Sequence, residues 1–132
     1  MRTLREIIHS KYNCKCAYCG CEITIKEMQV DHIIPKKTFR QTIVNNHKVP
    51  SFLTHLTEFD VEHIDNKNPA CRVCNKWKDA FDLELFRSEL SEQLNRLNKY
   101  SASYRIAKKY GLIEEKTKKI KFYFEHCKGI IL

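Results

Sequence analysis

Apolar and polar residues alternate in different ways along the first third of the chain. Apolar residues at three- and four-residue steps predict a short helix over residues 3–12, with Thr3 as its N-cap. Between residues 22 and 34 isoleucines alternate with polar residues and a second apolar group follows, which predicts two short strands. Pro35 ends this run. The pattern therefore places a helix before a small antiparallel sheet.

The second half of the chain has a helical pattern. An apolar stripe at three- and four-residue steps follows Asp82, which is suited to cap the helix: Leu83, Phe86, Leu90, Leu94 and Leu97. Ser101 or Ser103 is expected to cap a further short helix that Gly111 ends. Alternating aromatic and polar residues over 120–125 predict a last strand. The stripe, together with Trp77 and Phe81, is expected to lie in the core.

A long connection over residues 36–64 has no dominant pattern, although 51–56 could form a helical turn. Its three histidines, His47, His55 and His63, are interpreted as solvated side chains. If one of the three belongs to a functional site, we expect it to be His63.

Length and composition indicate one domain that spans residues 1–132. Hydrophobic residues make up 42% of the chain, which argues against global disorder. No apolar run approaches the roughly 20 residues of a membrane span, and the N-terminus lacks the apolar core of a signal peptide. We therefore expect a cytoplasmic protein that does not enter a membrane.

Seven cysteines without a secretory signal favour metal binding over a disulfide framework. Four of them form two Cys-x-x-Cys pairs, and two thiolates on each tight turn suit a tetrahedral zinc ion: Cys16, Cys19, Cys71 and Cys74. We predict one structural Zn²⁺ per chain, with free thiols or a redox pair as the alternative. Cys14 and Cys21 flank the first pair and are expected to be bystanders, although either could replace a ligand or bind a second metal. Cys127 is expected to be a plain thiol.

The second cysteine pair closes a turn over residues 66–74, after which a helix is expected to begin near Asn75. Since 51 residues separate Cys19 from Cys71, a folded segment must lie between the two turns.

The formal net charge of the chain is +8, and residues 96–132 carry ten Lys or Arg against three Asp or Glu. Such an excess favours a polyanionic partner, with nucleic acid first. The alternative is a solvated surface that keeps the protein soluble. Four lysines near the C-terminus are expected to contact the DNA backbone: Lys116, Lys118, Lys119 and Lys121.

Three short strings lie between and beside the cysteine pairs. They are Val-Asp-His-Ile-Ile-Pro at 30–35, Asp-Asn-Lys-Asn-Pro-Ala-Cys at 65–71 and Cys-Asn-Lys-Trp-Lys at 74–78. In this order the strings resemble the HNH (His-Asn-His) endonuclease family, and the resemblance covers residues 16–78. It implies a small α+β fold, with a ββα-metal core over about 12–80, a zinc-clamped double knuckle and a helical C-terminal extension over about 82–132.

The resemblance also implies an activity, which is metal-dependent hydrolysis of DNA phosphodiester bonds by nicking or double-strand cleavage. The products would carry 5′-phosphate and 3′-hydroxyl ends. Stand-alone chains of this kind resemble nucleases of phages or mobile elements. Double-stranded DNA is the expected partner.

Roles follow from the resemblance residue by residue. His32 is expected to be the general base, and Asp31 with Asn75 to hold a catalytic Mg²⁺ or Mn²⁺. Asn66 is expected to brace the loop that holds His32, with Asn68 as a rival because Lys67 stands where a Leu is common. Consecutive strand residues point to opposite faces, so Asp31 and His32 can serve one site only if the strand is locally distorted.

Two other functions remain open at this point. A non-catalytic zinc-containing DNA-binding module would use the cysteines and the basic tail. A metal-dependent RNase would use the same candidate active site on another substrate.

Overall fold

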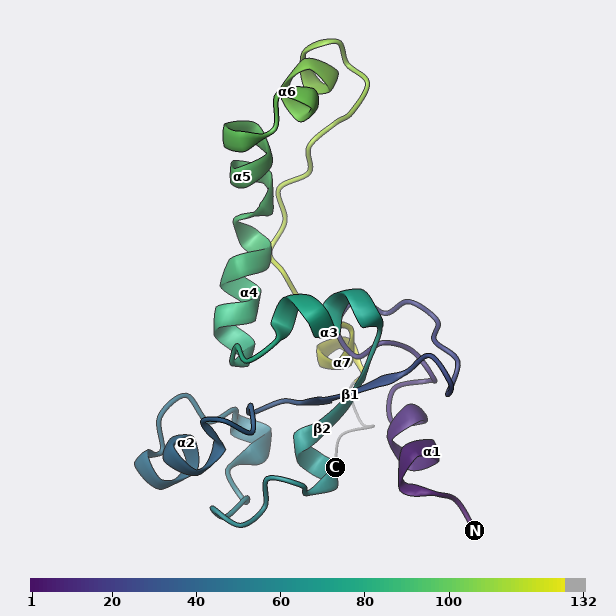
Figure 1. Ribbon diagram of the computed structural model, residues 1–132, viewed down its shortest axis with the longest axis vertical. Helices are drawn as coiled ribbons and strands as arrows, with labels where there is room; N and C mark the ends of the chain where they lie inside the picture. Colours follow the sequence, from purple (N-terminus) through teal and green to yellow (C-terminus); the bar gives the residue numbers. More distant parts are fainter. Residues whose placement is uncertain (128–132) are drawn as a thin grey trace.

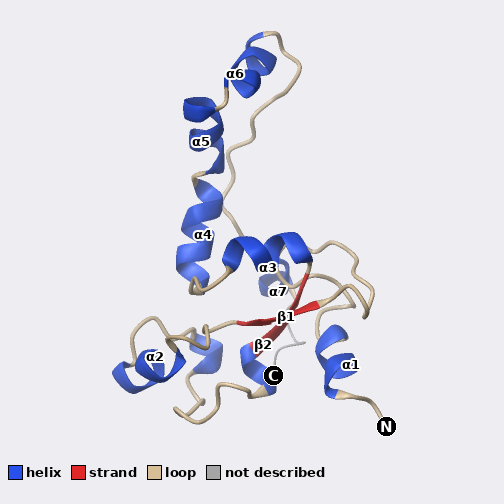
Figure 2. Cartoon of the chain, viewed as in Figure 1, coloured by secondary structure: helices blue, strands red, loops and turns tan. Residues whose placement is uncertain are grey.

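The computed structural model describes residues 1–127, and the chain consists of a body and a long helical projection (Figure 1). The fold is mixed α+β, mostly helical, with one two-stranded antiparallel sheet among the described residues (Figure 2). The helices are α1 (Leu4–His9), α2 (Phe39–Asn45), α3 (Arg72–Lys78), α4 (Leu83–Ser91), α5 (Gln93–Tyr100), α6 (Ala102–Lys109) and α7 (Tyr123–His126). The strands are β1 (Gln29–His32) and β2 (Lys67–Ala70), and two 3₁₀ turns are η1 (Ser51–Leu53) and η2 (Ile64–Asn66). No described helix is long and apolar enough to cross a membrane.

The sheet joins segments that lie far apart in the sequence. β1 and β2 pair antiparallel, with Asp31 opposite Asn68 and His32 opposite Lys67. α3 follows β2 after one residue, Cys71, and packs against β1. The strand β1, the strand β2 and the helix α3 thus form one strand–strand–helix unit.

Three sequence predictions in this region need correction. Only β1 forms within residues 22–34, and the expected first strand is reduced to a single bridge between Lys15 and Glu22. Residues 66–74, expected to be a turn, contain β2 and the start of α3. The helix begins before Asn75 because the Cys71 side chain caps it by accepting from the Cys74 amide at 3.4 Å.

The N-terminal helix is shorter than predicted, but Thr3 caps it as expected. The Thr3 hydroxyl accepts from the Glu6 amide at 3.1 Å, and the Glu6 carboxylate accepts from the Thr3 amide at 3.0 Å. This reciprocal capping box satisfies two amides that the helix itself leaves unpaired. α1 then buries Ile8 in a small apolar cluster with Ile23 and Met28.

The main core is rich in aromatic rings. The Tyr18 ring lies 5.2 Å from that of Phe122, 5.5 Å from that of Phe86 and 6.0 Å from that of Phe124, edge-on in each case. Edge-to-face packing is favoured because it aligns the positive rim of one ring with the negative face of another. The core therefore joins the first cysteine turn, α4 and the C-terminal segment.

The expected strand over residues 120–125 is not formed. Phe122 and Phe124 are buried, but α7 begins at Tyr123. Tyr123 and Phe124 donate their amides to the carbonyls of Tyr18 and Ala17 at 3.0 and 2.8 Å. These two hydrogen bonds dock the segment, and the Glu125 carboxylate accepts from the Phe122 amide at 2.8 Å to start a helical turn.

The predicted caps of the later helices are confirmed, since Asp82 accepts from Leu85 and Ser101 accepts from Tyr104. The apolar stripe, however, breaks at Glu92 into α4 and α5. Only the α4 end of the stripe reaches the core; Leu97 is 39% exposed. Trp77, also expected in the core, is 48% exposed on α3.

Replacing Phe122 by Ala should lower the free energy of unfolding by about 3–5 kcal/mol, because the ring is buried among three other aromatic rings. Chemical denaturation monitored by circular dichroism measures the change. The matched control is Tyr110→Ala, which removes a ring that is 74% exposed and should stay within about 0.5 kcal/mol of wild type. Equal losses in the two variants would contradict the assignment of the core.

Candidate metal centre and active site

The two cysteine turns meet in space. The sulfur atoms of four cysteines lie within 4.8 Å of one another: Cys16, Cys19, Cys71 and Cys74. A zinc ion with bonds of about 2.3 Å to four sulfurs separates them by about 3.8 Å. The Sγ atoms of Cys19 and Cys71 are 3.8 Å apart. This group could therefore hold a metal ion such as zinc.

Local backbone geometry brings the sulfur atoms together. Gly20 follows the first pair with a φ of +80°, and a Cβ there would approach the Tyr123 ring to 3.0 Å. Only glycine fits both the left-handed backbone and the close ring. On the other side, the first turn of α3 directs the Cys74 amide at Cys71. Cys14, Cys21 and Cys127 are outside the four-sulfur group.

The sulfurs in the group shift the pKa of one another in opposite directions. The hydrogen bond between Cys16 and Cys74 lowers the pKa of Cys16 to about 4, although burial opposes the shift. The same hydrogen bond, helped by burial, raises the pKa of Cys74. The group already favours a thiolate at Cys16, which is the form of cysteine that binds metals.

Three of the four predicted active-site residues line one hollow of about 270 Å³, and Asn66 is not among the lining residues. β1 contributes Asp31 and His32, and α3 contributes Asn75. Lys36, Lys37 and Asp79 complete its polar wall. Neighbouring strand residues point to opposite faces, and the partners differ accordingly: the Asp31 carboxylate contacts Tyr18 and Lys78, whereas the His32 ring contacts Glu62.

Asp31 is buried and fully partnered. Its carboxylate accepts hydrogen bonds from the Tyr18 hydroxyl and the Lys78 ammonium, with the ammonium at 3.1 Å from Oδ2. Lys78 also donates to the His32 carbonyl at 2.9 Å. Burial raises the pKa of Asp31, and Lys78 and Tyr18 oppose the rise. Burial likewise lowers the pKa of Lys78 against the attraction of Asp31.

His32 is held by a residue for which the sequence offered no signal. Its Nε2 lies 2.6 Å from a Glu62 carboxylate oxygen, and the Lys67 ammonium lies 3.4 Å from the other. His32 and Lys67 are directly opposite in the ladder, so their side chains share a face of the sheet. The hydrogen bond from His32 lowers the pKa of Glu62. Lys67, where the family pattern commonly has Leu, thus has an electrostatic partner.

Asn66 links the two segments beside the site. Its side-chain amide accepts from the Ile34 amide at 2.8 Å and donates to the carbonyls of Ile34 and Val61 at 3.2 and 3.1 Å. Asn68 instead donates to the Tyr18 hydroxyl at 3.4 Å, and its Oδ1 has no hydrogen-bond partner among the described residues. The backbone bridge therefore lies at Asn66 rather than at Asn68.

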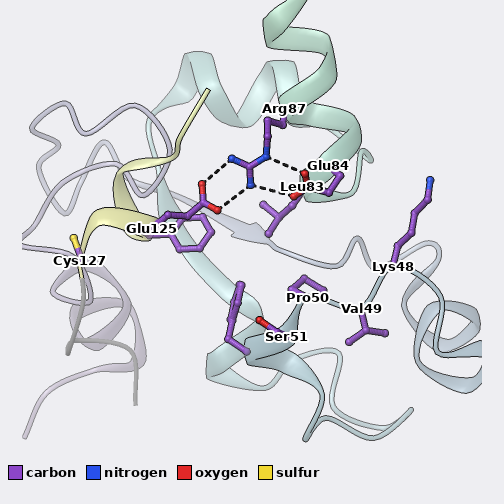
Figure 3. Close-up of a pocket in the computed structure, with 11 residues that line it drawn as sticks. Lys48, Val49, Pro50, Ser51, Leu83, Glu84, Arg87, Glu125 and Cys127 are labelled. Atoms are coloured by element: carbon purple, nitrogen blue, oxygen red, sulfur yellow. Dashed lines mark hydrogen bonds and ion pairs between the residues drawn. The ribbon is translucent and has the colours of Figure 1, made fainter. Parts of the chain in front are cut away.

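Other polar groups lie outside this hollow. His55 and His63 flank Asp65, with His55 Nε2 2.8 Å from the carboxylate, while His47 is exposed on the loop after α2. A separate hollow of about 520 Å³ lies between residues 48–52, α4 and α7 and contains none of the predicted site residues (Figure 3).

The four C-terminal lysines do not enter a strand as expected. Residues 113–122 form no helix or strand, and Arg87 of α4 holds the end of the segment by donating to the Ile120 carbonyl at 2.9 Å. Lys118, Lys119 and Lys121 line a hollow of about 770 Å³ with Arg87 and His126, while Lys116 lies farther along the segment. None of the four forms an ion pair with a residue in 1–127.

Comparison with family models, curated proteins and solved structures finds no match for this chain.

The four-sulfur group leads to a direct prediction about metal content. The purified protein should contain one zinc per chain by elemental analysis, and Cys71→Ser should lose it, with a lower thermal midpoint and broader unfolding. Cys14→Ser is the matched control, because Cys14 is exposed and outside the group. Full zinc content in Cys71→Ser, or zinc loss in Cys14→Ser, would contradict the assignment.

Proposed function

We propose that this protein is a metal-dependent endonuclease that hydrolyses DNA phosphodiester bonds. The observation that carries the proposal is that Asp31, His32 and Asn75 line the same hollow, although 42 residues separate His32 from Asn75. These are the three residues to which the HNH resemblance assigns a base and two metal ligands. The convergence is independent of the motif, since a chain that merely contained the strings would not have to bring them together.

His32 is the general base in this proposal. If Nε2 carries the proton donated to Glu62, Nδ1 is left as the nitrogen that accepts a proton from the attacking water. Glu62 therefore fixes the tautomer, and the opposing Lys67 keeps the Glu62 carboxylate in place. His32 is partly buried, so its ring is restrained while the hollow remains open to substrate.

The donor set of the hollow fits a hard divalent cation. Asp31 and Asn75 would hold Mg²⁺ or Mn²⁺ through oxygen atoms, and Asp79 is a third oxygen donor on the same wall. Such an ion supplies charge stabilisation at the phosphoryl oxygens. Lys78 already neutralises Asp31, so the carboxylate has to be shared between the ammonium and the ion. The Lys78 ammonium also donates to the His32 carbonyl, so one side chain fixes both the proposed metal ligand, Asp31, and the backbone of the proposed base, His32.

The two other functions make different demands on these residues. A zinc-containing DNA-binding module without activity has no use for a buried Asp31 beside a carboxylate-bound His32. An RNase would use the same residues, so only the choice of substrate distinguishes it from a DNase. The net positive charge suits either nucleic acid.

Supercoiled plasmid incubated with the protein and Mg²⁺ or Mn²⁺ should become nicked or linear, and EDTA should abolish the reaction. His32→Ala should lower the rate by about 10²–10⁴-fold, the usual contribution of a general base, while zinc content and thermal midpoint stay at wild-type values. His55→Ala is the matched control, because His55 is also bonded to a carboxylate but lies outside the hollow. Cleavage by His32→Ala at the wild-type rate would refute the proposal. Cleavage of RNA alone would select the RNase.

The role of Glu62 is tested by two substitutions. Glu62→Ala removes the acceptor for His32 Nε2, and kcat should fall about 10–100-fold. Glu62→Gln keeps an oxygen acceptor and should recover most of the activity. Nitrogen NMR of the His32 ring should show a single tautomer in wild type and Glu62→Gln, and a mixture in Glu62→Ala. An unchanged tautomer together with an unchanged kcat in Glu62→Ala would show that Glu62 has no positioning role.

A further inference from the structure

Almost all of the net charge is concentrated in one segment. Residues 93–121 contain nine cationic side chains: Arg96, Lys99, Arg105, Lys108, Lys109, Lys116, Lys118, Lys119 and Lys121. Against them stand two acidic residues, Glu114 and Glu115, so the segment carries +7 of the formal net charge of +8. We call residues 93–121 the arm.

The arm projects from the body of the protein. α4 and α5 lie roughly end to end, α6 folds back at the tip, and the chain returns alongside them (Figure 1). No residue of α5 or α6 is buried. Burial of an amphipathic face is the usual source of helix stability in proteins. Two helices that bury so little are therefore poorly explained by a contribution to the core.

Polar contacts nevertheless hold the arm in one conformation. Near the tip, the Glu115 carboxylate accepts from Asn98 at 2.6 Å, from the Tyr104 hydroxyl at 2.7 Å and from Lys108 at 3.2 Å. Arg105 donates to the last carbonyls of α5, those of Asn98 and Lys99, at 3.0 and 2.9 Å.

At the base, Arg87 pairs with Glu125 at 2.8 Å and with Glu84 at 3.0 Å (Figure 3). Arg87 also donates to the Ile120 carbonyl at 2.9 Å, which fixes the returning chain. The arm is thus tied at both ends, and its surface is presented in a defined position.

Ion pairs with acidic residues neutralise only some of the cationic side chains of the arm. Arg96 pairs with Glu89, and Lys108 pairs with Glu115. The cations with no carboxylate partner among residues 1–127 include Lys99 and Lys109 at the tip as well as the four C-terminal lysines.

Exposed tyrosine side chains lie next to two of these cations, Lys99 and Lys109. Tyr100 is 73% exposed with the Lys99 ammonium 5.2 Å from its ring centre, and Tyr110 is 74% exposed beside Lys109. Tyrosine is common in protein interfaces, but lysine is depleted there, whereas DNA phosphates accept hydrogen bonds from both lysine and tyrosine. The combination fits a nucleic acid better than a second protein surface.

We propose that the arm is a second DNA-contacting element, which grips the duplex on one side of the cleavage position. This inference rests on the proposed function, because it assigns the arm to the substrate of the same site. Asp82, which caps α4, lies four residues after Lys78, whose ammonium contacts Asp31. The helix α4 therefore starts beside the candidate active site and connects it to the arm.

The combined length of α4 and α5 sets the length of duplex between the candidate active site and the arm tip. Residues 83–100 of α4 and α5 extend about 27 Å at 1.5 Å per residue. That length corresponds to about eight base pairs at 3.4 Å each. Lysines along the returning chain and at the tip would meet phosphates over this distance, and the footprint would be one-sided.

Binding is measured on the full chain with His32→Ala, so that cleavage does not intervene. Fluorescence anisotropy with a labelled 30-base-pair duplex gives Kd over a range of salt concentrations. Lys99→Gln with Lys109→Gln should weaken binding and reduce the log–log salt slope by about 1.8, or 0.9 for each lost phosphate contact. Tyr100→Ala with Tyr110→Ala should weaken binding and leave the slope unchanged, because neither ring is charged.

The matched control removes the same charge elsewhere. Arg2→Gln with Lys26→Gln alters two exposed cations near α1: Arg2 precedes this helix, and the Lys26 carbonyl accepts from Arg5. Since α1 lies away from the arm (Figure 1), this variant should keep wild-type Kd and salt slope, and its counterpart with His32 intact should keep wild-type plasmid cleavage. Hydroxyl-radical footprinting should protect about eight base pairs on one side of the cleavage position, and the lysine pair variant should lose that protection. Thermal midpoints equal to that of wild type show that the exposed substitutions leave the fold intact.

Wild-type affinity and slope in the lysine pair variant would overturn the proposal. Tip substitutions that convert a dimer to a monomer in sedimentation, with DNA affinity unchanged, would make the tip a contact between two copies and would also overturn it. Failure of the proposed function is distinguishable, because a protein that cuts nothing can still show the arm-dependent Kd and salt slope.

Discussion

The meeting of the two cysteine turns is the constraint on which the rest of the body depends. Cys71 directly follows β2 and caps α3, and Cys74 lies on the first turn of that helix. Asn75 is the next residue, and Lys78 is one helical turn farther on. A movement of the sulfur atoms would therefore shift the end of the sheet, the predicted metal ligand and the partner of Asp31 together. A four-sulfur site gives these residues a common, rigid origin.

The buried pair of Asp31 and Lys78 is a different kind of interaction. Removing two charges from water costs several kcal/mol for each ion, and apolar residues of similar volume often stabilise a core equally well or better. Burial accordingly shifts the pKa of both groups toward the neutral form. Stability alone thus gives little reason for this pair to be in the core. A carboxylate that is kept in place at the edge of a hollow is more readily explained by the chemistry of that hollow.

Sequence reasoning succeeded where the signal is local. Cysteine spacing placed the four sulfurs together, and capping residues such as Thr3 and Asp82 marked the starts of helices. β2 was missed because Asn68 and Pro69 are turn-forming residues, yet the strand is buried throughout and gains its partner from β1. Glu62 was missed for the same reason, since its contact with His32 depends on how a 34-residue connection between the strands folds. Tertiary contacts decided both positions, and no local pattern encodes them.

The positive charge of the protein lies almost entirely in the arm and not in the body that contains the hollow. Outside the arm, 15 cationic residues face 14 acidic ones, so the body that holds the hollow carries a formal charge of only +1. At physiological ionic strength charges are screened over about 8 Å, and the field of the arm tip is therefore weak at the hollow. A polyanion would be attracted mainly by the arm, whereas at the hollow it would meet Asp31 with its charge balanced by Lys78, and His32 bonded to Glu62. Binding affinity and cleavage rate could then vary independently. Substitutions in the arm would alter DNA binding without disturbing the contact between His32 and Glu62. Substitutions in the hollow would alter the cleavage rate without changing the basic surface of the arm.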